Sequence, residues 1–101
     1  MTSTGIESYL GFAVRAKKVV FGLECLLRLK VAPEVVLYDS SLGSSAKKKA
    51  QTFCQNRNAA FLPVKEGYLN EVLKRNNVKI VAVLDGSLGG QIKRILASDS
   101  L

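Results

Sequence analysis

The chain has 101 residues, of which 48% are hydrophobic, and this is enough apolar material for one folded domain with a real core. The 15 Lys and Arg against 8 Asp and Glu give a net charge of +7 that is spread over both halves, which favours a polyanionic partner for the folded unit. Without a histidine, and with only two cysteines, the chain offers almost no support for a metal site.

The two cysteines and the lengths of the apolar runs indicate the cellular compartment. Cys25 and Cys54 both fall in predicted helices among apolar neighbours, so we expect two free, buried thiols and no disulfide. The longest apolar run, Ile80 to Leu84, is far too short to span a bilayer, and the N-terminus lacks a charged region followed by an apolar core. We therefore expect a cytoplasmic protein with no membrane partner.

The first third of the chain predicts a helix, a strand and a second helix. Apolar residues at helical spacing form one buried stripe on a helix that ends near Ala16. This stripe consists of Ile6, Leu10, Ala13 and Val14. The segment Lys18 to Phe21 has the β-branched and aromatic character of a strand, and Gly22 permits a tight turn after it. A second helix is predicted from Leu23 to about Val31, closed by Pro33.

The middle of the chain predicts an inner strand, a helix and an outer strand. Val35 to Tyr38 is a nearly continuous apolar run, which is typical of a central strand covered on both faces. Ser44 or Ser45 can cap a third helix with one apolar face. That face consists of Ala46, Ala50, Phe53 and Cys54. Ala59 to Val64 predicts a third strand, which Pro63 places near an edge of the sheet.

The last third adds a short helix, a second inner strand and a final helix. Tyr68 to Lys74 predicts the short helix, and Lys79 to Leu84 predicts a fully apolar strand. The final helix begins at about Ser87 and buries four apolar residues. These are Leu88, Ile92, Ile95 and Leu96. The order predicts a single α/β domain over residues 1–101, with a mixed or parallel sheet of about four strands between helix layers.

The stretch Arg15 to Lys30 is the strongest candidate for a binding site. It reads RAKKVVFGLECLLRLK, in which a strand delivers a helix start beyond Gly22. The first helical amides have no internal partner there and, with the helix dipole, favour phosphate or an electronegative base edge. Positive charge is added by Lys17, Lys18 and Arg28. The alternative is an ordinary strand-turn-helix unit whose lysines are solvated.

Catalytic chemistry has little support in the sequence. Without histidine, the acid or base candidates shrink to carboxylates such as Glu24 and Asp85, which nothing pairs. The glycine-rich segment Gly86 to Gly90 is a weak turn signal, and no Walker-type phosphate loop occurs. The triplet Lys47 to Lys49 is interpreted as a solvated face, with phosphate contact as the alternative. We therefore expect no enzyme and no cofactor.

Three segments carry a resemblance to a known family. They read LGFAVRAKKVVFG, LYDSSLGSSAKKKAQTFCQNRNAAFLPV and VKIVAVLDG, and they resemble the kink-turn-binding ribosomal proteins of the L-seven-Ae and L-thirty-e group over nearly the whole chain. The lysine triplet followed by Cys54 is most similar to the small bacterial YlxQ-like branch, whose members are stand-alone domains. The resemblance implies a three-layer α/β/α sandwich that binds RNA bent by tandem sheared G·A pairs.

The resemblance also implies which residues contact RNA. The family motif at the start of the second helix matches Gly22, Glu24, Cys25 and Arg28, with Glu24 where asparagine is common and Cys25 where glutamate is common. Gly22 lets RNA approach the backbone, Glu24 accepts hydrogen bonds from guanine, and Arg28 reaches a base edge or phosphate. The family's second contact is the loop before the last strand. Here that loop contains Asn77, Val78 and Lys79.

The implied partner is structured RNA, either in the ribosome or in another RNA-protein particle, with Lys17 and Lys18 holding the RNA backbone. DNA is not expected as a partner, and a monomer is the simplest state. The aromatic residues fall mostly at core-facing positions, which disfavours single-strand binding by stacking. The alternative function is a protein-interaction module that uses an apolar helix face. Salt distinguishes the two, because phosphate-driven binding weakens steeply as salt rises.

Overall fold

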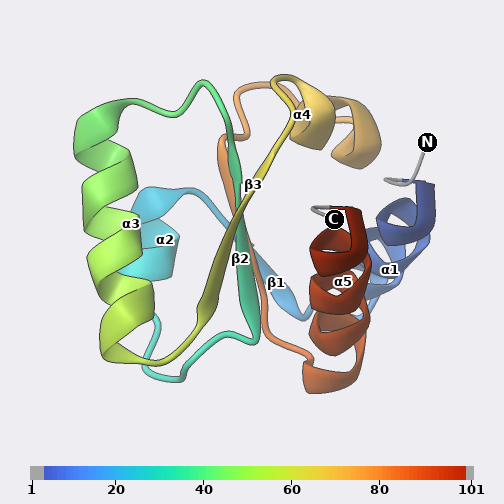
Figure 1. The fold of residues 1–101 in the computed structure, drawn as a ribbon, viewed down its shortest axis with the longest axis horizontal. Coiled ribbons are helices and arrows are strands. Elements are labelled where there is room, and N and C mark those ends of the chain that lie inside the picture. The colour runs from blue at the N-terminus through green and yellow to red at the C-terminus, as the bar shows by residue number, and fades with distance from the viewer. Residues whose placement is uncertain (1–3, 100–101) are drawn as a thin grey trace.

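The computed structural model describes residues 4–99, and the side chains of residues 6–96. Helices and strands alternate along this part of the chain, as the apolar patterns predict. In chain order they are α1 (Thr4–Arg15), β1 (Val19–Phe21), α2 (Leu23–Leu27), β2 (Val35–Asp39), α3 (Ser44–Asn56), β3 (Ala60–Val64), α4 (Tyr68–Leu73), β4 (Ile80–Val83) and α5 (Gly86–Asp99). The predicted α/β class is confirmed (Figure 1).

The strands form one mixed sheet in the order β1-β4-β2-β3. Strand β4 is antiparallel to both β1 and β2, whereas β2 and β3 are parallel. The two fully apolar runs therefore lie inside the sheet, as expected for strands covered on both faces. Strand β3 is an edge strand, and its exposed Pro63 lacks the N–H that an inner strand would need.

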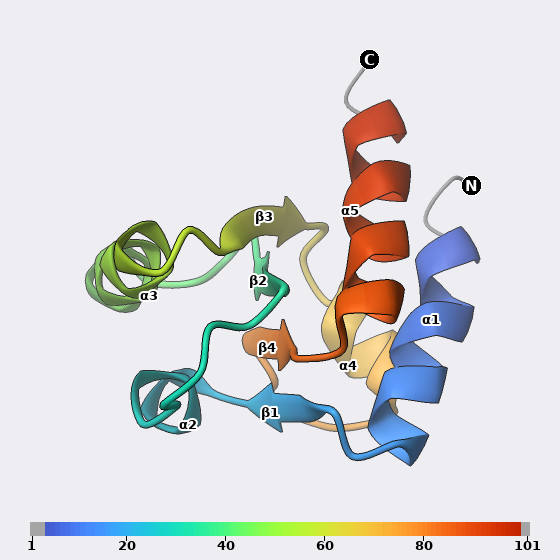
Figure 2. The ribbon, with the colours of Figure 1, turned by 90° about the horizontal axis from the view of Figure 1, so that it is seen from below.

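Helices cover both faces of the sheet and form a three-layer α/β/α sandwich (Figure 2). Helices α1, α4 and α5 lie on one face, and α2 and α3 lie on the other. Because side chains alternate along a strand, Val35 and Leu37 of β2 point into the first helix layer while Val36 points into the second. Each face of β2 and β4 is thus the floor of a separate apolar core.

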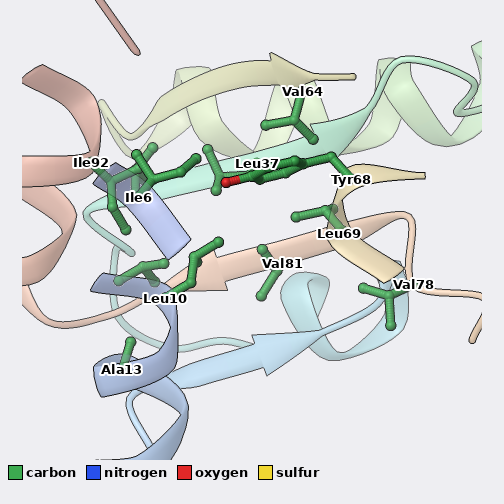
Figure 3. Close-up of a cluster of buried hydrophobic side chains, with 12 residues drawn as sticks. Ile6, Leu10, Ala13, Leu37, Val64, Tyr68, Leu69, Val78, Val81 and Ile92 are labelled. Carbon is green, nitrogen blue, oxygen red and sulfur yellow. The ribbon is translucent and has the colours of Figure 1, made fainter. Parts of the chain in front are cut away.

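The core under α1, α4 and α5 holds three of the four residues of the apolar stripe predicted for the first helix, and the fourth, Val14, is half-buried outside it (Figure 3). Ile6, Leu10 and Ala13 are fully buried, and Ile92 of α5 packs with them. Ile92 is one of four residues of α5 that were expected from the sequence to be buried, and the other three are partly exposed. These three are Leu88, Ile95 and Leu96. None of the helices within residues 4–99 is long and apolar enough to span a bilayer.

The core under α2 and α3 contains one of the two cysteines. Cys54 is buried beside Ala50 and Phe53, and burial raises the pKa of its thiol to about 11, against a smaller opposing effect of the Arg57 charge. The thiol is therefore protonated at neutral pH. The expectation that Cys25 is buried is wrong, because Cys25 lies on the outer side of the short α2 and is exposed. Both thiols are free, as expected.

Helix α2 is shorter than the apolar spacing predicts. It ends at Leu27, where the N–H of Arg28 is shared between the carbonyls of Glu24 and Cys25. The chain leaves the helix here because it must re-enter the sheet early: the N–H of Glu34 already donates to Val83 O, at 2.9 Å. As a result Val31, expected in the buried stripe, is 59% exposed.

Helix α3 also differs in its cap, since Gly43 occupies the N-cap position in place of a serine side chain.

The same valine-to-alanine substitution is expected to lower the free energy of unfolding by different amounts at a buried and at an exposed position. Val36→Ala removes two methyl groups from a fully buried site on β2 and is expected to lower the free energy of unfolding by about 2–3 kcal/mol. Val31→Ala, at the exposed position after α2, is expected to change it by less than about 0.5 kcal/mol. Urea unfolding followed by circular dichroism measures both. Equal losses at the two sites would contradict the early end of α2.

Candidate nucleic-acid interface

Two of the predicted RNA-contact segments meet at one end of the sheet. Gly22 continues β1 beyond Phe21, and its N–H donates to the carbonyl of Ile80 at 3.0 Å. Ile80 is the first residue of β4, so the loop that ends at Lys79 lies directly beside the start of α2. Antiparallel pairing therefore brings together two stretches that are far apart in the sequence. Figure 1 shows the same end of the sheet with β2 and α4 beside it.

The backbone of Gly22 explains why glycine stands at this junction. Its φ of 87° and ψ of 158° lie in a region that is essentially restricted to glycine. No other atom lies within 4 Å of the position that a Cβ would take, so the restriction comes from the backbone and not from crowding. The same open space leaves the junction accessible to the backbone of a ligand.

The exposed side of α2 carries a carboxylate and a guanidinium. Glu24 and Arg28 are one helical turn apart, with 3.9 Å between Oε1 and Nη2, and both side chains are more than 80% exposed. Such a pair contributes little to stability, and a ligand can separate it at small cost. Because α2 has only five residues, its dipole is small, and any attraction for an anion at this end comes from side chains.

The loop before β4 is held from inside by Asn70. The side-chain oxygen of Asn70 accepts the N–H of Val78 at 2.8 Å, and Asn77 adopts a left-handed conformation with φ of 61°. Val78, the apolar residue that the family resemblance places against RNA, is buried in the core under α1, α4 and α5. The residues that this loop exposes are therefore Asn77 and Lys79.

A buried carboxylate at the end of β2 organises the neighbouring loop. Asp39 is fully covered, and its Oδ1 accepts the backbone N–H of Ser41 at 2.8 Å and the Ser41 hydroxyl at 2.5 Å. Its Oδ2 accepts the N–H of Gly67 at 2.9 Å. Lys79 Nζ in turn donates to Ser41 Oγ at 2.7 Å. The network therefore joins the ends of β2 and β3 to the lysine that begins the last strand.

These contacts determine the charge of Asp39. Burial alone opposes ionisation, but the hydrogen bonds from Ser41 and Gly67, together with the positive charge of Lys79, outweigh it and hold the pKa of Asp39 below its ordinary value of 3.8. Asp39 is therefore ionised at neutral pH. The sequence patterns described above do not single out this aspartate. The signal that identifies it is the spacing of Asp39 and Ser41, which is typical of an Asx turn.

Arg75 is a second residue that the sequence analysis missed. Its guanidinium lies 4.2 Å from the centre of the Phe21 ring, at the end of β1 and next to Gly22. The preceding Lys74 has a left-handed backbone with φ of 55°, which turns the chain after α4 toward this strand end. No sequence motif marks Arg75, because its position depends on pairing between β1 and β4. Arg75 and Lys79 are thus two cations at this end of the sheet, and Arg28 adds a third at the end of α2.

Lys17 and Lys18 do not belong to this group. They precede β1, and the carbonyl of Lys18 accepts the N–H of Leu84 at 2.7 Å, beyond the last residue of β4. The length of β1 separates them from Gly22, a distance of about 13 Å along an extended strand. Of the predicted site residues, the structure therefore gathers Gly22, Glu24, Cys25, Arg28, Asn77 and Lys79 at one end, buries Val78, and leaves the two lysines at the other.

Comparisons with known proteins bear on the fold. No protein-family model matches the chain, and no curated protein is significantly similar to it. Among solved structures, a protein of unknown function from Bacillus halodurans superposes with a TM-score of 0.84 at 20% sequence identity. The match covers 91% of this chain and 96% of that one. At this identity the likeness establishes a shared fold.

Metal binding gains no support from side-chain positions. Within the part of the chain that the structure describes, no three His, Cys, Asp or Glu side chains gather closely enough to hold an ion. The carboxylate most deeply covered, Asp39, has its oxygens engaged by Ser41 and Gly67.

Gly22→Ala tests the strained junction. The substitution is expected to lower the free energy of unfolding by about 1–3 kcal/mol, because alanine must adopt a glycine-only backbone conformation. Gly90→Ala is the control: Gly90 lies inside α5 with open space around it, so alanine there is expected to stabilise by about 0.5–1 kcal/mol. Thermal and urea unfolding measure the sign and size of the stability change for both variants. A neutral Gly22→Ala would show that the junction relaxes freely.

Asp39→Asn tests the buried carboxylate through pH. Since the folded-state pKa is depressed, ionised Asp39 stabilises the fold at pH values above 3.8, and this contribution is lost as the pH falls through the folded pKa. At pH 7 we expect the variant to be less stable by about 1–3 kcal/mol. The difference from the parent should shrink in acid, where Asp39 is protonated. Urea unfolding at pH 7 and in acid measures it, and a constant difference would contradict the assignment.

Proposed function

We propose that this protein is a non-catalytic RNA-binding protein of the kink-turn-binding ribosomal protein type, acting in the cytoplasm as a monomer. The proposed ligand is a bent, structured RNA, free or within the ribosome. The proposed contact surface is the end of the sheet formed by Gly22, α2 and the loop before β4. The family resemblance of the three sequence segments motivates the proposal, and the structure adds a geometry that is compatible with it.

One observation carries the proposal. The hydrogen bond from Gly22 N–H to Ile80 O places the two segments that the resemblance assigns to RNA contact side by side. Neither segment alone would distinguish an RNA site from an ordinary turn. Together they form one exposed edge that offers an accessible backbone at Gly22 and cations at Arg28, Arg75 and Lys79.

The side chains divide into base-reading and phosphate-binding groups. Glu24 is exposed on α2 and can accept hydrogen bonds from the N1 and N2 groups of guanine. Arg75 and Lys79 lie in the connection between α4 and β4, where basic side chains suit the phosphate backbone of a bent RNA. Cys25 is exposed next to Glu24 but offers only a weak donor. Base recognition thus depends mainly on Glu24 and on the exposed backbone of the junction.

A kink-turn RNA is the decisive ligand. We expect the protein to bind such an RNA more tightly than the same sequence with its sheared G·A pairs converted to Watson-Crick pairs, in titrations at one near-physiological salt concentration. Glu24→Ala is expected to cost about 1–3 kcal/mol on the kinked RNA and little on the plain duplex. Equal binding to both RNAs by the parent protein would reject recognition of the bend.

Substituting two lysines in turn tests whether RNA contacts the proposed edge or is attracted only by the overall positive charge of the protein. Lys79→Ala removes a cation at the proposed edge and is expected to reduce the salt slope of kinked-RNA binding by about one unit. Lys18→Ala, the matched control at the other end of β1, is expected to leave the slope nearly unchanged. A larger effect at Lys18 would move the contact surface to the opposite end of the sheet.

A further inference from the structure

A shallow groove lies between α2 and α3, away from the strand ends described above. Its volume is about 590 Å³, and its floor is apolar, formed by Leu27 of α2 and Phe53 of α3. Lys48 and Lys49 of α3 also line it, together with Arg57, the residue that follows α3. None of the residues that line the groove is assigned above to RNA contact.

The groove exists because the two helices differ in length. Helix α2 stops at Leu27 after five residues, whereas α3 continues for 13 residues. The short helix therefore covers only part of α3 (Figure 1). Leu27 at its end is 42% exposed. Beyond Leu27, a turn and bends that leave Val31 exposed replace the further turn of helix that the sequence pattern predicts. An apolar strip thus remains on the surface where a longer helix would have covered it.

The charged side chains that line the groove are all positive. No carboxylate lines it, and the sequence from Ser40 to Lys65 contains no Asp or Glu. The acidic residue of α2, Glu24, lies one turn before Arg28 and pairs with it at 3.9 Å. Lys48 and Lys49 are exposed, and within the described residues no ion pair involves either of them. An occupant that complements the groove must therefore be acidic.

The groove is poorly suited to RNA bases. Phe53 is almost fully buried, and the guanidinium of Arg57 covers its ring at 4.0 Å from the centre. The other rings on this side of the sheet, Tyr38 and Phe61, stack on each other at 4.2 Å. Unpaired bases bind chiefly by stacking on free aromatic rings, and this groove offers none. The apolar side chain that the groove exposes is Leu27, and it is suited to the leucine-like side chain of a peptide.

We propose that the α2–α3 groove binds a short acidic peptide segment of another protein, with an apolar side chain on Leu27 and carboxylates on Lys48 and Lys49. This mode combines an apolar anchor with a charged rim, as in complexes where an amphipathic helix lies in a surface groove. The groove adjoins the RNA edge at α2, where Leu27 precedes Arg28, but its lysines lie on α3. The inference does not depend on RNA binding.

The test uses a defined probe. A fluorescein-labelled peptide of about 12 residues, with leucines at helical spacing among glutamates, is titrated with the protein and followed by anisotropy. Two matched peptides are the controls, one with lysine in place of every glutamate and one with alanine in place of every leucine. We expect only the acidic, leucine-containing peptide to bind, with amide NMR shifts confined to α2, α3 and the segment between Arg28 and Pro33.

Variants locate the contact. Lys48→Glu combined with Lys49→Glu is expected to weaken the peptide by about tenfold and to reduce its salt dependence. Lys47→Glu is the matched control on the same helix turn, since Lys47 lies over the Tyr38 ring and outside the groove, and it is expected to change affinity less than about twofold. Leu27→Ala, at a half-exposed position, is expected to weaken binding by about threefold to tenfold with the salt dependence intact.

Three outcomes would overturn the proposal: equal binding of the acidic and basic peptides, equal losses for Lys47 and for the Lys48 and Lys49 pair, or NMR shifts in the groove with kink-turn RNA and none with peptide. The last result would assign the groove to RNA. Loss of kink-turn binding by the parent protein bears only on the RNA edge, so the two proposals fail separately.

Discussion

The position of β4 between β1 and β2 is the constraint on which the rest of the structure depends. At the start of this strand, consecutive carbonyls are engaged from opposite sides: Lys79 O accepts the N–H of Asp39 at 2.8 Å, and Ile80 O accepts the N–H of Gly22 at 3.0 Å. Backbone bonds of this kind leave no freedom of register, since a slip of one residue would exchange the two cores. The exposed edge is thus fixed by the same pairing that separates the two apolar cores.

Rigidity at this edge comes from polar groups that are satisfied internally. Asp39 of β2 accepts hydrogen bonds from Ser41 and Gly67, and Asn70 of α4 accepts the N–H of Val78, so the loop after β2 is tied to the sheet and the loop before β4 is tied to α4. A buried carboxylate is tolerated here because each oxygen accepts hydrogen bonds and a lysine lies nearby. Such ordering reduces the entropy that a ligand would have to remove from the loops.

The sequence predicted the elements well and their spatial grouping poorly. Long apolar runs identified the inner strands and the stripe of α1, since burial on both faces or on one leaves a clear pattern. The grouping of side chains depends on pairing between distant strands, and no single-sequence pattern shows it. Arg75 was therefore missed, and Lys18 was grouped with residues at the opposite end of β1. The failure at α2 has another cause: helical spacing from Leu23 to Val31 is a local preference, which the return of the chain to β2 overrides.

The early end of α2 changes the functional argument twice. A five-residue helix has a weak dipole, so the attraction of this edge for an anion passes from the helix start to the cations that the sheet places around it. The same truncation exposes Leu27 and Val31 and leaves α3 partly uncovered. Basic side chains on this protein therefore occur in two different surroundings. Beside Gly22 it surrounds open backbone and a carboxylate, which suits a structured RNA, whereas along α3 it surrounds aliphatic surface without a free aromatic ring, which suits an acidic peptide.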